Sequence, residues 1–221
     1  MLGMLHRKTI ADIIPDLPFS EIRKRARILV VDDDEQAFPY RLLQREGYNV
    51  QYWSRIESLK ELESGEFDLI VLDIFGVASQ EISINDGLGV LEHIKKYNPA
   101  QLVIAYSGQK YDFSQASFWR IADDYLGKPS SLVECKEKID TLLKNSFTPE
   151  RYWGEIVQVL SEAGVNQKQL RQFESQIVKS VQSGKQIAAS NIEKQLAIAH
   201  HSAAIIAVLI QILYRFFTKT P

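Results

Sequence analysis

The chain has 221 residues, of which 45% are apolar and 24% charged, and its formal net charge is −2. This composition is typical of a globular protein and allows one domain with extensions or two small domains. The single cysteine, Cys135, excludes an intrachain disulfide and indicates a reducing compartment. Because the first residues lack the apolar run of a signal peptide, we expect a cytoplasmic protein.

Charge is distributed unevenly along the chain. Residues 1–26 carry a net charge of +2, residues 27–147 carry −7 from 13 basic and 20 acidic residues, and residues 148–221 carry +3. This distribution favours three parts: an N-terminal extension (1–26), a central domain (27–147) and a C-terminal region (148–221). A surplus of three positive charges supports nucleic-acid binding only weakly, and a solvated surface of mixed charge explains it more simply.

Residues 27–147 alternate between short apolar runs and helical patterns. The apolar runs predict strands at 27–31, 48–53, 67–73 and 101–107, and a short strand within 124–129. The helical patterns lie at 35–47, 54–65, 86–99, 114–124 and 132–145. Capping boxes are predicted at Ser54 with Glu57 and at Ser131 with Glu134. The alternation predicts an α/β fold, a five-stranded parallel sheet that is doubly wound with helices on both faces.

Polar residues follow four of these strands. They are Asp32, Asp33 and Asp34 after the first strand, Asp73 at the end of the third, Ser107 at the end of the fourth, and Lys128 after the fifth. Each alone is explained as a turn or cap residue, but their ordered occurrence at one edge of a parallel sheet is not. Crowded carboxylates need a cation, and oxygen ligands favour Mg²⁺. With a lysine and a hydroxyl to contact phosphoryl oxygens, the set predicts a site for an aspartyl phosphate.

The region resembles the receiver domain of two-component response regulators. The resemblance rests on "ILVVDDDE", "FDLIVLDI", "DGLGVLEHIK", "VIAYSG" and "DDYLGKPSSLVECKEKI", and it covers residues 27–147. It implies a flavodoxin-like fold in which Asp32, Asp33, Asp73 and the backbone carbonyl of Phe75 bind Mg²⁺. It also implies that Asp73 accepts a phosphoryl group from a histidine kinase or phosphotransfer protein.

The same resemblance implies a switch. Ser107 and Tyr125 would move on phosphorylation, Lys128 would contact the phosphate, and the bond before Pro129 would be cis. Such a domain changes shape and turns over no outside substrate, so we expect no enzymatic activity. We expect Asp34 and the following Glu35 to begin the next helix, at the positive end of its dipole.

The segment "IFGVASQEISINDG" (74–87) departs from the family pattern. It lacks the usual proline and is about six residues longer than the family's turn. One interpretation is that it shields the phosphate, adjusts its lifetime or contacts a specific partner. The other is a tolerated surface insertion, since lengthening a loop costs little free energy.

Residues 148–217 predict helices at 148–165 and 166–184, followed by one long helix or two over 185–217. The pattern of a helix-turn-helix is missing, so DNA binding is not favoured. Residues 195–214 contain no Asp, Glu, Lys or Arg and are long enough to span a bilayer. His200, His201 and Gln211 would be costly in lipid, so a helix buried in a bundle or dimer is favoured. The two histidines are better explained as an exposed or interfacial pair than as phosphotransfer residues.

The sequence therefore predicts a response regulator whose receiver controls an all-α, non-enzymatic C-terminal module through a downstream protein target or a homodimer. Two other hypotheses remain open. One is a transcriptional regulator with an atypical DNA-binding region. The other is a signalling effector attached to a membrane through residues 195–217.

Overall fold

The computed structural model describes residues 8–56, 58–108 and 120–218. These residues form two compact units, and each is described by itself. Residues 17–148 form one unit, and residues 8–16 join 149–218 in the other. The first 26 residues are therefore divided between the two units, whereas the sequence analysis predicted a single N-terminal extension.

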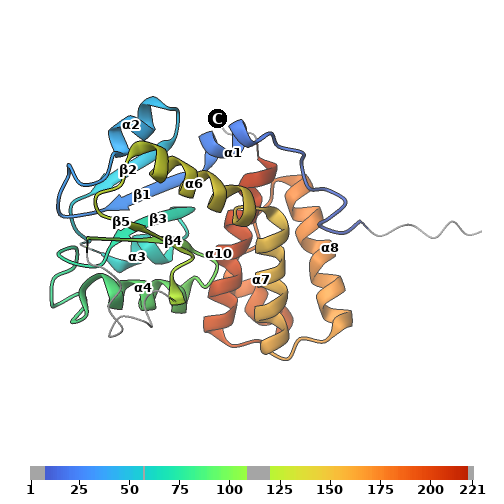
Figure 1. Ribbon diagram of the computed structural model, residues 1–221. Coiled ribbons are helices and arrows are strands. Elements are labelled where there is room, and N and C mark those ends of the chain that lie inside the picture. The colour runs from blue at the N-terminus through green and yellow to red at the C-terminus, as the bar shows by residue number, and fades with distance from the viewer. Residues whose placement is uncertain (1–7, 57, 109–119, 219–221) are drawn as a thin grey trace, which may run out of the picture. The chain divides into compact units, whose positions relative to one another are not determined.

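The first unit is built on a parallel five-stranded sheet (Figure 1). Its strands are β1 (Arg27–Val31), β2 (Asn49–Trp53), β3 (Leu69–Asp73), β4 (Leu102–Ser107) and β5 (Asp124–Gly127). Their order across the sheet is β2-β1-β3-β4-β5, and β3 and β4 are buried along their whole length. The predicted α/β fold is confirmed. Because the winding changes direction between β1 and β3, their carboxyl ends border the crevice in which such sheets bind ligands.

Helices cover both faces of this sheet (Figure 1). The described helices of this unit are α1 (Phe19–Arg25), α2 (Tyr40–Arg45), α3 (Leu59–Glu63), α4 (Asp86–Tyr97) and α6 (Leu132–Ser146). Helices α3 and α4 lie on one face, where Leu29, Leu72 and Val103 of the sheet pack with Leu62 and Leu91 of the helices. Helices α2 and α6 lie on the other face. Most of the predicted helix at 114–124 lies outside the described residues.

Two predicted helix starts are wrong. Helix α2 begins at Tyr40 and not at Glu35, because Pro39 has no backbone N–H and keeps the residue before it out of the helical conformation. Helix α3 begins after Ser58 and not after Ser54. In the segment before α3, Ile56 forms a β-bridge with Ala78, and Glu57 of the predicted capping box lies outside the described residues. The other predicted capping box, Ser131 with Glu134, is confirmed at the start of α6.

Arg23 of helix α1 contacts Tyr48, directly before β2, and Asp140 of α6. The guanidinium carbon of Arg23 lies over the ring of Phe19 and over that of Tyr48, 5.1 and 5.0 Å from their centroids. It also pairs with Asp140 of α6 at 2.8 Å, and the Tyr48 hydroxyl donates to the same carboxylate at 2.5 Å. Residues 17–26 are therefore an integral part of the sheet unit, beside its edge strand.

The second unit consists of the helices α7 (Pro149–Glu162), α8 (Gln167–Ser183), α9 (Ala189–Leu196) and α10 (His200–Phe217). Helix α10 packs against the other three. The segment 185–217 forms two helices because Ala197 adopts a left-handed conformation, with φ of 53°. Residues 8–16 join this unit through Ile10, whose N–H donates to Glu174 of α8 at 3.1 Å.

Helix α10 is the one helix among the described residues that is long and apolar enough to cross a membrane. Core helices of soluble proteins share these properties. Its buried residues include Ile206, Leu209 and Phe216, and the Phe216 ring lies 5.9 Å from that of Tyr152 in α7. These contacts favour the predicted buried helix. His200 is exposed at the start of α10, with Nδ1 3.0 Å from Glu193 Oε2.

Candidate acidic site at the carboxyl edge of the sheet

Three carboxylates meet where β1 and β3 end. Because these strands are neighbours in parallel register, Asp32 and Asp33 after β1 come to lie beside Asp73 at the end of β3. One oxygen from each of the three lies within 4.8 Å of the others. Asp32 and Asp73 are buried and Asp33 is exposed, so the group opens to solvent on one side.

Lys128, directly after β5, balances two of these charges. Its Nζ donates to Asp73 Oδ2 at 2.5 Å and lies 2.7 Å from Asp32 Oδ2. Burial raises the pKa of Asp73, and the hydrogen bond from Lys128 opposes this effect without cancelling it. Burial by itself would lower the pKa of Lys128, but its bonds to the two carboxylates raise it above the usual value. The lysine is therefore charged and held at the carboxylates.

The donor set fits Mg²⁺. Asp32 Oδ1 accepts a hydrogen bond from Asp34 N at 3.0 Å, whereas the buried Oδ2 has the Lys128 ammonium 2.7 Å away and no hydrogen bond of good geometry within the described part of the chain. A buried carboxylate oxygen that lacks a well-placed hydrogen-bond donor is suited to bind a cation. Mg²⁺ prefers oxygen ligands and retains several waters, which the exposed side at Asp33 can admit. Phe75, the expected carbonyl ligand, follows in the next loop, and its N–H donates to Asp73 Oδ1 at 3.2 Å.

The expected switch residues lie on the neighbouring strands. Ser107 is buried at the end of β4, and its carbonyl oxygen accepts from Lys128 N at 2.8 Å. Tyr125 of β5 is 59% exposed, with Lys138 Nζ 5.7 Å from its ring centroid, so its side chain faces outward in this structure. The predicted cis peptide bond between Lys128 and Pro129 is confirmed.

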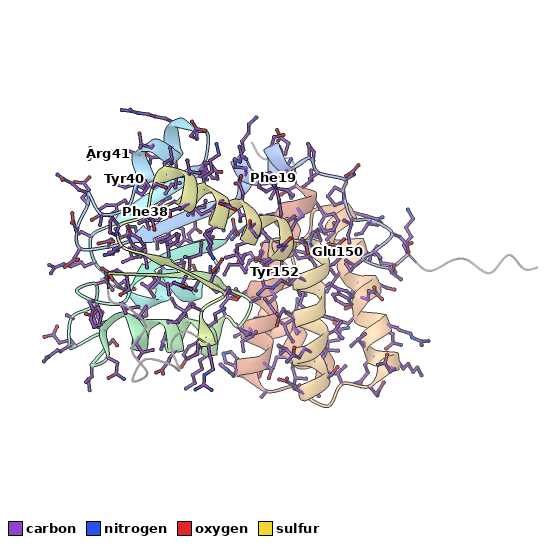
Figure 2. The ribbon with its side chains drawn as sticks, in the orientation of Figure 1. Phe19, Phe38, Tyr40, Arg41, Glu150 and Tyr152 are labelled. Carbon is purple, nitrogen blue, oxygen red and sulfur yellow. The ribbon has the colours of Figure 1, made fainter. Side chains whose placement is uncertain are left out.

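The remaining acids of the "DDDE" run do not begin a helix, and that prediction is wrong. Asp34 and Glu35 lie in a turn before α2, in which Asp34 Oδ1 accepts from Gln36 N at 2.9 Å. Glu35 accepts from the Tyr40 hydroxyl at 2.7 Å and pairs with Arg41 at 2.5 Å. Tyr40 and Arg41 lie together at the start of α2 in Figure 2.

Sequence reasoning missed three side chains that hold the loops around the site. The Tyr52 hydroxyl donates to the backbone oxygen of Asp32 at 2.5 Å, and the Tyr106 hydroxyl donates to that of Ala37 at 2.6 Å. Asp86 binds the loop after β3. Asp86 and Tyr106 lie in the family motifs "DGLGVLEHIK" and "VIAYSG", whereas Tyr52 lies outside the motifs that carry the resemblance.

No family model matches the chain, but curated relatives do. The chain is 34% identical over 98 residues to the transcriptional regulatory protein CiaR of Streptococcus pneumoniae, which covers 44% of this chain and 41% of that protein. It is 30% identical over 125 residues to the alkaline phosphatase synthesis transcriptional regulatory protein PhoP of Bacillus subtilis, which covers 54% and 49%. The chain thus spans at most about half the length of these relatives.

Solved structures of receiver domains are also similar. A CheY-like response regulator receiver domain protein from Methanospirillum hungatei is 28% identical, with a TM-score of 0.47, over 55% of this chain and 95% of that one. The receiver domain of NtrX from Brucella abortus is 27% identical, with a TM-score of 0.47, over 54% and 99%.

The parallel sheet, the ordered residues at its edge and the curated relatives define a class of signalling domain. The sheet unit of this chain is a response regulator receiver domain.

Proposed function

We propose that this receiver is phosphorylated on Asp73 in the presence of Mg²⁺, by a phosphohistidine of a histidine kinase or phosphotransfer protein. The observation that carries the proposal is the position of Lys128 Nζ, between Asp73 at 2.5 Å and Asp32 at 2.7 Å, beside the three converging carboxylates. A cation, a nucleophilic carboxylate and a metal-binding pair at one sheet edge are the parts that phosphoryl transfer to an aspartate requires.

In this reaction an oxygen of Asp73 forms a bond to phosphorus while the bond from phosphorus to the imidazole nitrogen breaks. The electron pair of the broken bond stays on that nitrogen, which takes up a proton as the neutral histidine is restored. Bound Mg²⁺ supplies positive charge to the phosphoryl oxygens. Lys128 opposes the effect of burial on the pKa of Asp73 and so favours its ionised form, and it then contacts the transferred group.

The response is a change of conformation. A phosphoryl group adds up to two negative charges and three acceptor oxygens, which attract the Ser107 hydroxyl and the Lys128 ammonium. Tyr125, exposed here, would then turn inward and alter the surface of β5 and α6. The phosphoryl group stays on the protein, so the domain is a switch and not an enzyme acting on an outside substrate.

We further propose that the helical unit carries the output through a downstream protein or a homodimer of this chain. The second candidate is transcriptional control, because the names of both curated relatives describe transcriptional regulators. Binding to duplex DNA that weakens steeply with salt, measured with and without phosphodonor, would favour this second candidate.

The phosphorylation proposal is tested by incubating the protein with Mg²⁺ and a small-molecule phosphodonor and measuring its intact mass. We expect one added phosphoryl group on the wild type and none on Asp73→Asn. Asp34→Asn, which removes an equal charge from a neighbouring turn, should be phosphorylated like the wild type. No adduct on the wild type, or an equal adduct on Asp73→Asn, would refute the proposal.

A further inference from the structure

The loop after β3 is tied to the start of α4 by one carboxylate. Asp86 Oδ2 accepts from Gly76 N at 2.5 Å, and Oδ1 accepts from Val77 N at 3.1 Å and from Ala78 N at 2.8 Å. Three backbone donors on one carboxylate make strong, charge-assisted hydrogen bonds. The loop is therefore held by a residue that follows it by eight to ten positions.

Residues 74–78, the first part of the segment 74–87, make structural contacts with the rest of the sheet unit. Val77 is buried, and its carbonyl oxygen accepts from Ile56 N at 2.7 Å. Gly87 N donates to Ile74 O at 3.2 Å, and a Cβ added at Gly87 would lie 2.3 Å from the backbone oxygen of Asp73. The start of α4 thus packs directly on the backbone that carries the candidate phosphoacceptor. Because of these contacts, a tolerated surface insertion does not describe residues 74–78, although residues 75–76, 79–81 and 84–85 are exposed.

The peptide between Phe75 and Gly76 is placed at the edge of the acidic site. Phe75 N donates to Asp73 Oδ1 at 3.2 Å, and a Cβ added at Gly76 would lie 2.4 Å from Asp33 Oδ2. The N–H of Gly76 and the carbonyl of Phe75 belong to this one planar trans unit and point in opposite directions. The hydrogen bond from Gly76 N to Asp86 therefore also fixes the direction of the Phe75 carbonyl.

We propose that Asp86 is a positioning residue for the metal, acting through the Phe75–Gly76 peptide. By holding Gly76 N–H it orients the Phe75 carbonyl as an Mg²⁺ ligand. A negative acceptor on the N–H also polarises the peptide and increases the negative charge on the carbonyl oxygen. This inference rests on the proposed function, since it assigns a role in the same Mg²⁺ site.

The backbone at Asp86 limits which substitutions are informative. Its φ is 50°, in the left-handed region that Asp, Asn and Gly tolerate best. Asp86→Asn keeps this conformation and can still accept from Val77 N and Ala78 N, but it turns an NH₂ group toward Gly76 N–H and so breaks that one bond. Asp86→Gly relaxes the backbone and removes all three bonds.

The test is a calorimetric titration of the unphosphorylated full chain with Mg²⁺. We expect the Kd to rise about tenfold in Asp86→Asn, the scale typical of residues that orient metal ligands. The rise should be at least as large in Asp86→Gly. Asp34→Asn is the charge-matched control, and its exposed carboxylate should change the Kd much less because water and salt screen it.

A second measurement reports the hydrogen bond without metal. In the proton–nitrogen NMR spectrum recorded in EDTA, the Gly76 amide proton should shift upfield in both Asp86 variants and stay in place in Asp34→Asn. An unchanged Gly76 amide, or a Kd for Asp86→Asn no weaker than for Asp34→Asn, would overturn the positioning role. A wild type that binds no Mg²⁺ would instead overturn the proposed function on which the role rests.

Discussion

Lys128 Nζ lies 2.5 Å from Asp73 Oδ2, and this contact joins the end of β5 to the end of β3. The side chains are only 19% and 6% exposed, and the same ammonium lies 2.7 Å from the fully buried carboxylate of Asp32. Removing the lysine would leave two buried carboxylates without a counter-charge in the metal-free protein, which is costly.

Lys128→Met should therefore lower the free energy of unfolding by about 3 kcal/mol at pH 8 without metal. The loss should be smaller at pH 5, because burial raises the pKa of Asp73 and favours its protonation there, and Mg²⁺ at pH 8 should restore part of it. Urea denaturation at both pH values measures the effect. Lys138→Met, which breaks the more exposed pair with Asp124, is the control and should cost less than about 1 kcal/mol. An equal loss at both pH values would contradict the interpretation.

Asp68, just before β3, should make stability depend on pH. Burial raises the pKa of Asp68 to about 7, although its hydrogen bonds with Arg27 oppose the effect. The unfolded value is near 3.9, so between about pH 4 and 7 the folded chain holds a proton that the unfolded chain releases. Stability from this group is greatest below pH 4 and falls as pH rises to about 7, by at most about 1.4 kcal/mol per pH unit.

Asp68→Asn keeps an acceptor for Arg27 N and cannot ionise, so it should flatten this decline. Denaturation midpoints of the wild type and the variant between pH 4.5 and 8 measure the difference. Because the pKa of Asp73 is also raised, some slope will remain in the variant. Identical slopes in the two proteins would show that Asp68 does not titrate in this range.

Helix α1 should contribute to the stability of the receiver through Arg23. A double-mutant cycle with Arg23→Ala and Asp140→Ala should give a coupling free energy of about 1 kcal/mol, since the two side chains are in direct contact and mostly buried. Lys24→Ala with Glu21→Ala, an exposed pair on the same helix, should give close to zero. Equal coupling in the two cycles would mean that α1 is not anchored through Arg23.

Substitutions at two residues of α10 test whether this helix is buried. Leu209 is fully buried and Gln211 is exposed. Leu209→Ala should lower the free energy of unfolding by about 3 kcal/mol, whereas Gln211→Ala should change it by less than about 0.5 kcal/mol. Denaturation of the full chain in detergent-free buffer measures both. A negligible cost for Leu209→Ala would indicate that this face is not part of a packed core.

The fold of the receiver could be predicted because its signals are local. β1 and β3 are continuous apolar runs that end at acidic residues, and Ser131 with Glu134 forms the predicted capping box. The convergence of Asp32 and Asp73 followed from the rule that parallel strands end at one edge. These predictions required no knowledge of side-chain contacts.

The wrong start of α2 has a local cause, Pro39, whereas other features were missed because distant contacts override the local pattern. The Ser54 cap failed because Ile56 pairs with Ala78, and neither residue alone indicates that bridge. The role of Asp86 depends on a loop that folds back over ten residues. The sequence left open whether 185–217 forms one helix or two, because Ala197, where the helix is interrupted, is neither Gly nor Pro. The anchoring of α1 likewise depends on an aspartate 117 positions away from Arg23.

The central claim is that Asp73, among the three converging carboxylates, receives the phosphoryl group. The most direct measurement is to phosphorylate the full chain in Mg²⁺, reduce the acyl phosphate with borohydride and locate the resulting homoserine by peptide mass spectrometry. We predict homoserine at position 73 only. Homoserine at position 32 or 33, or no homoserine in a sample whose intact mass shows a phosphoryl adduct, would contradict the account.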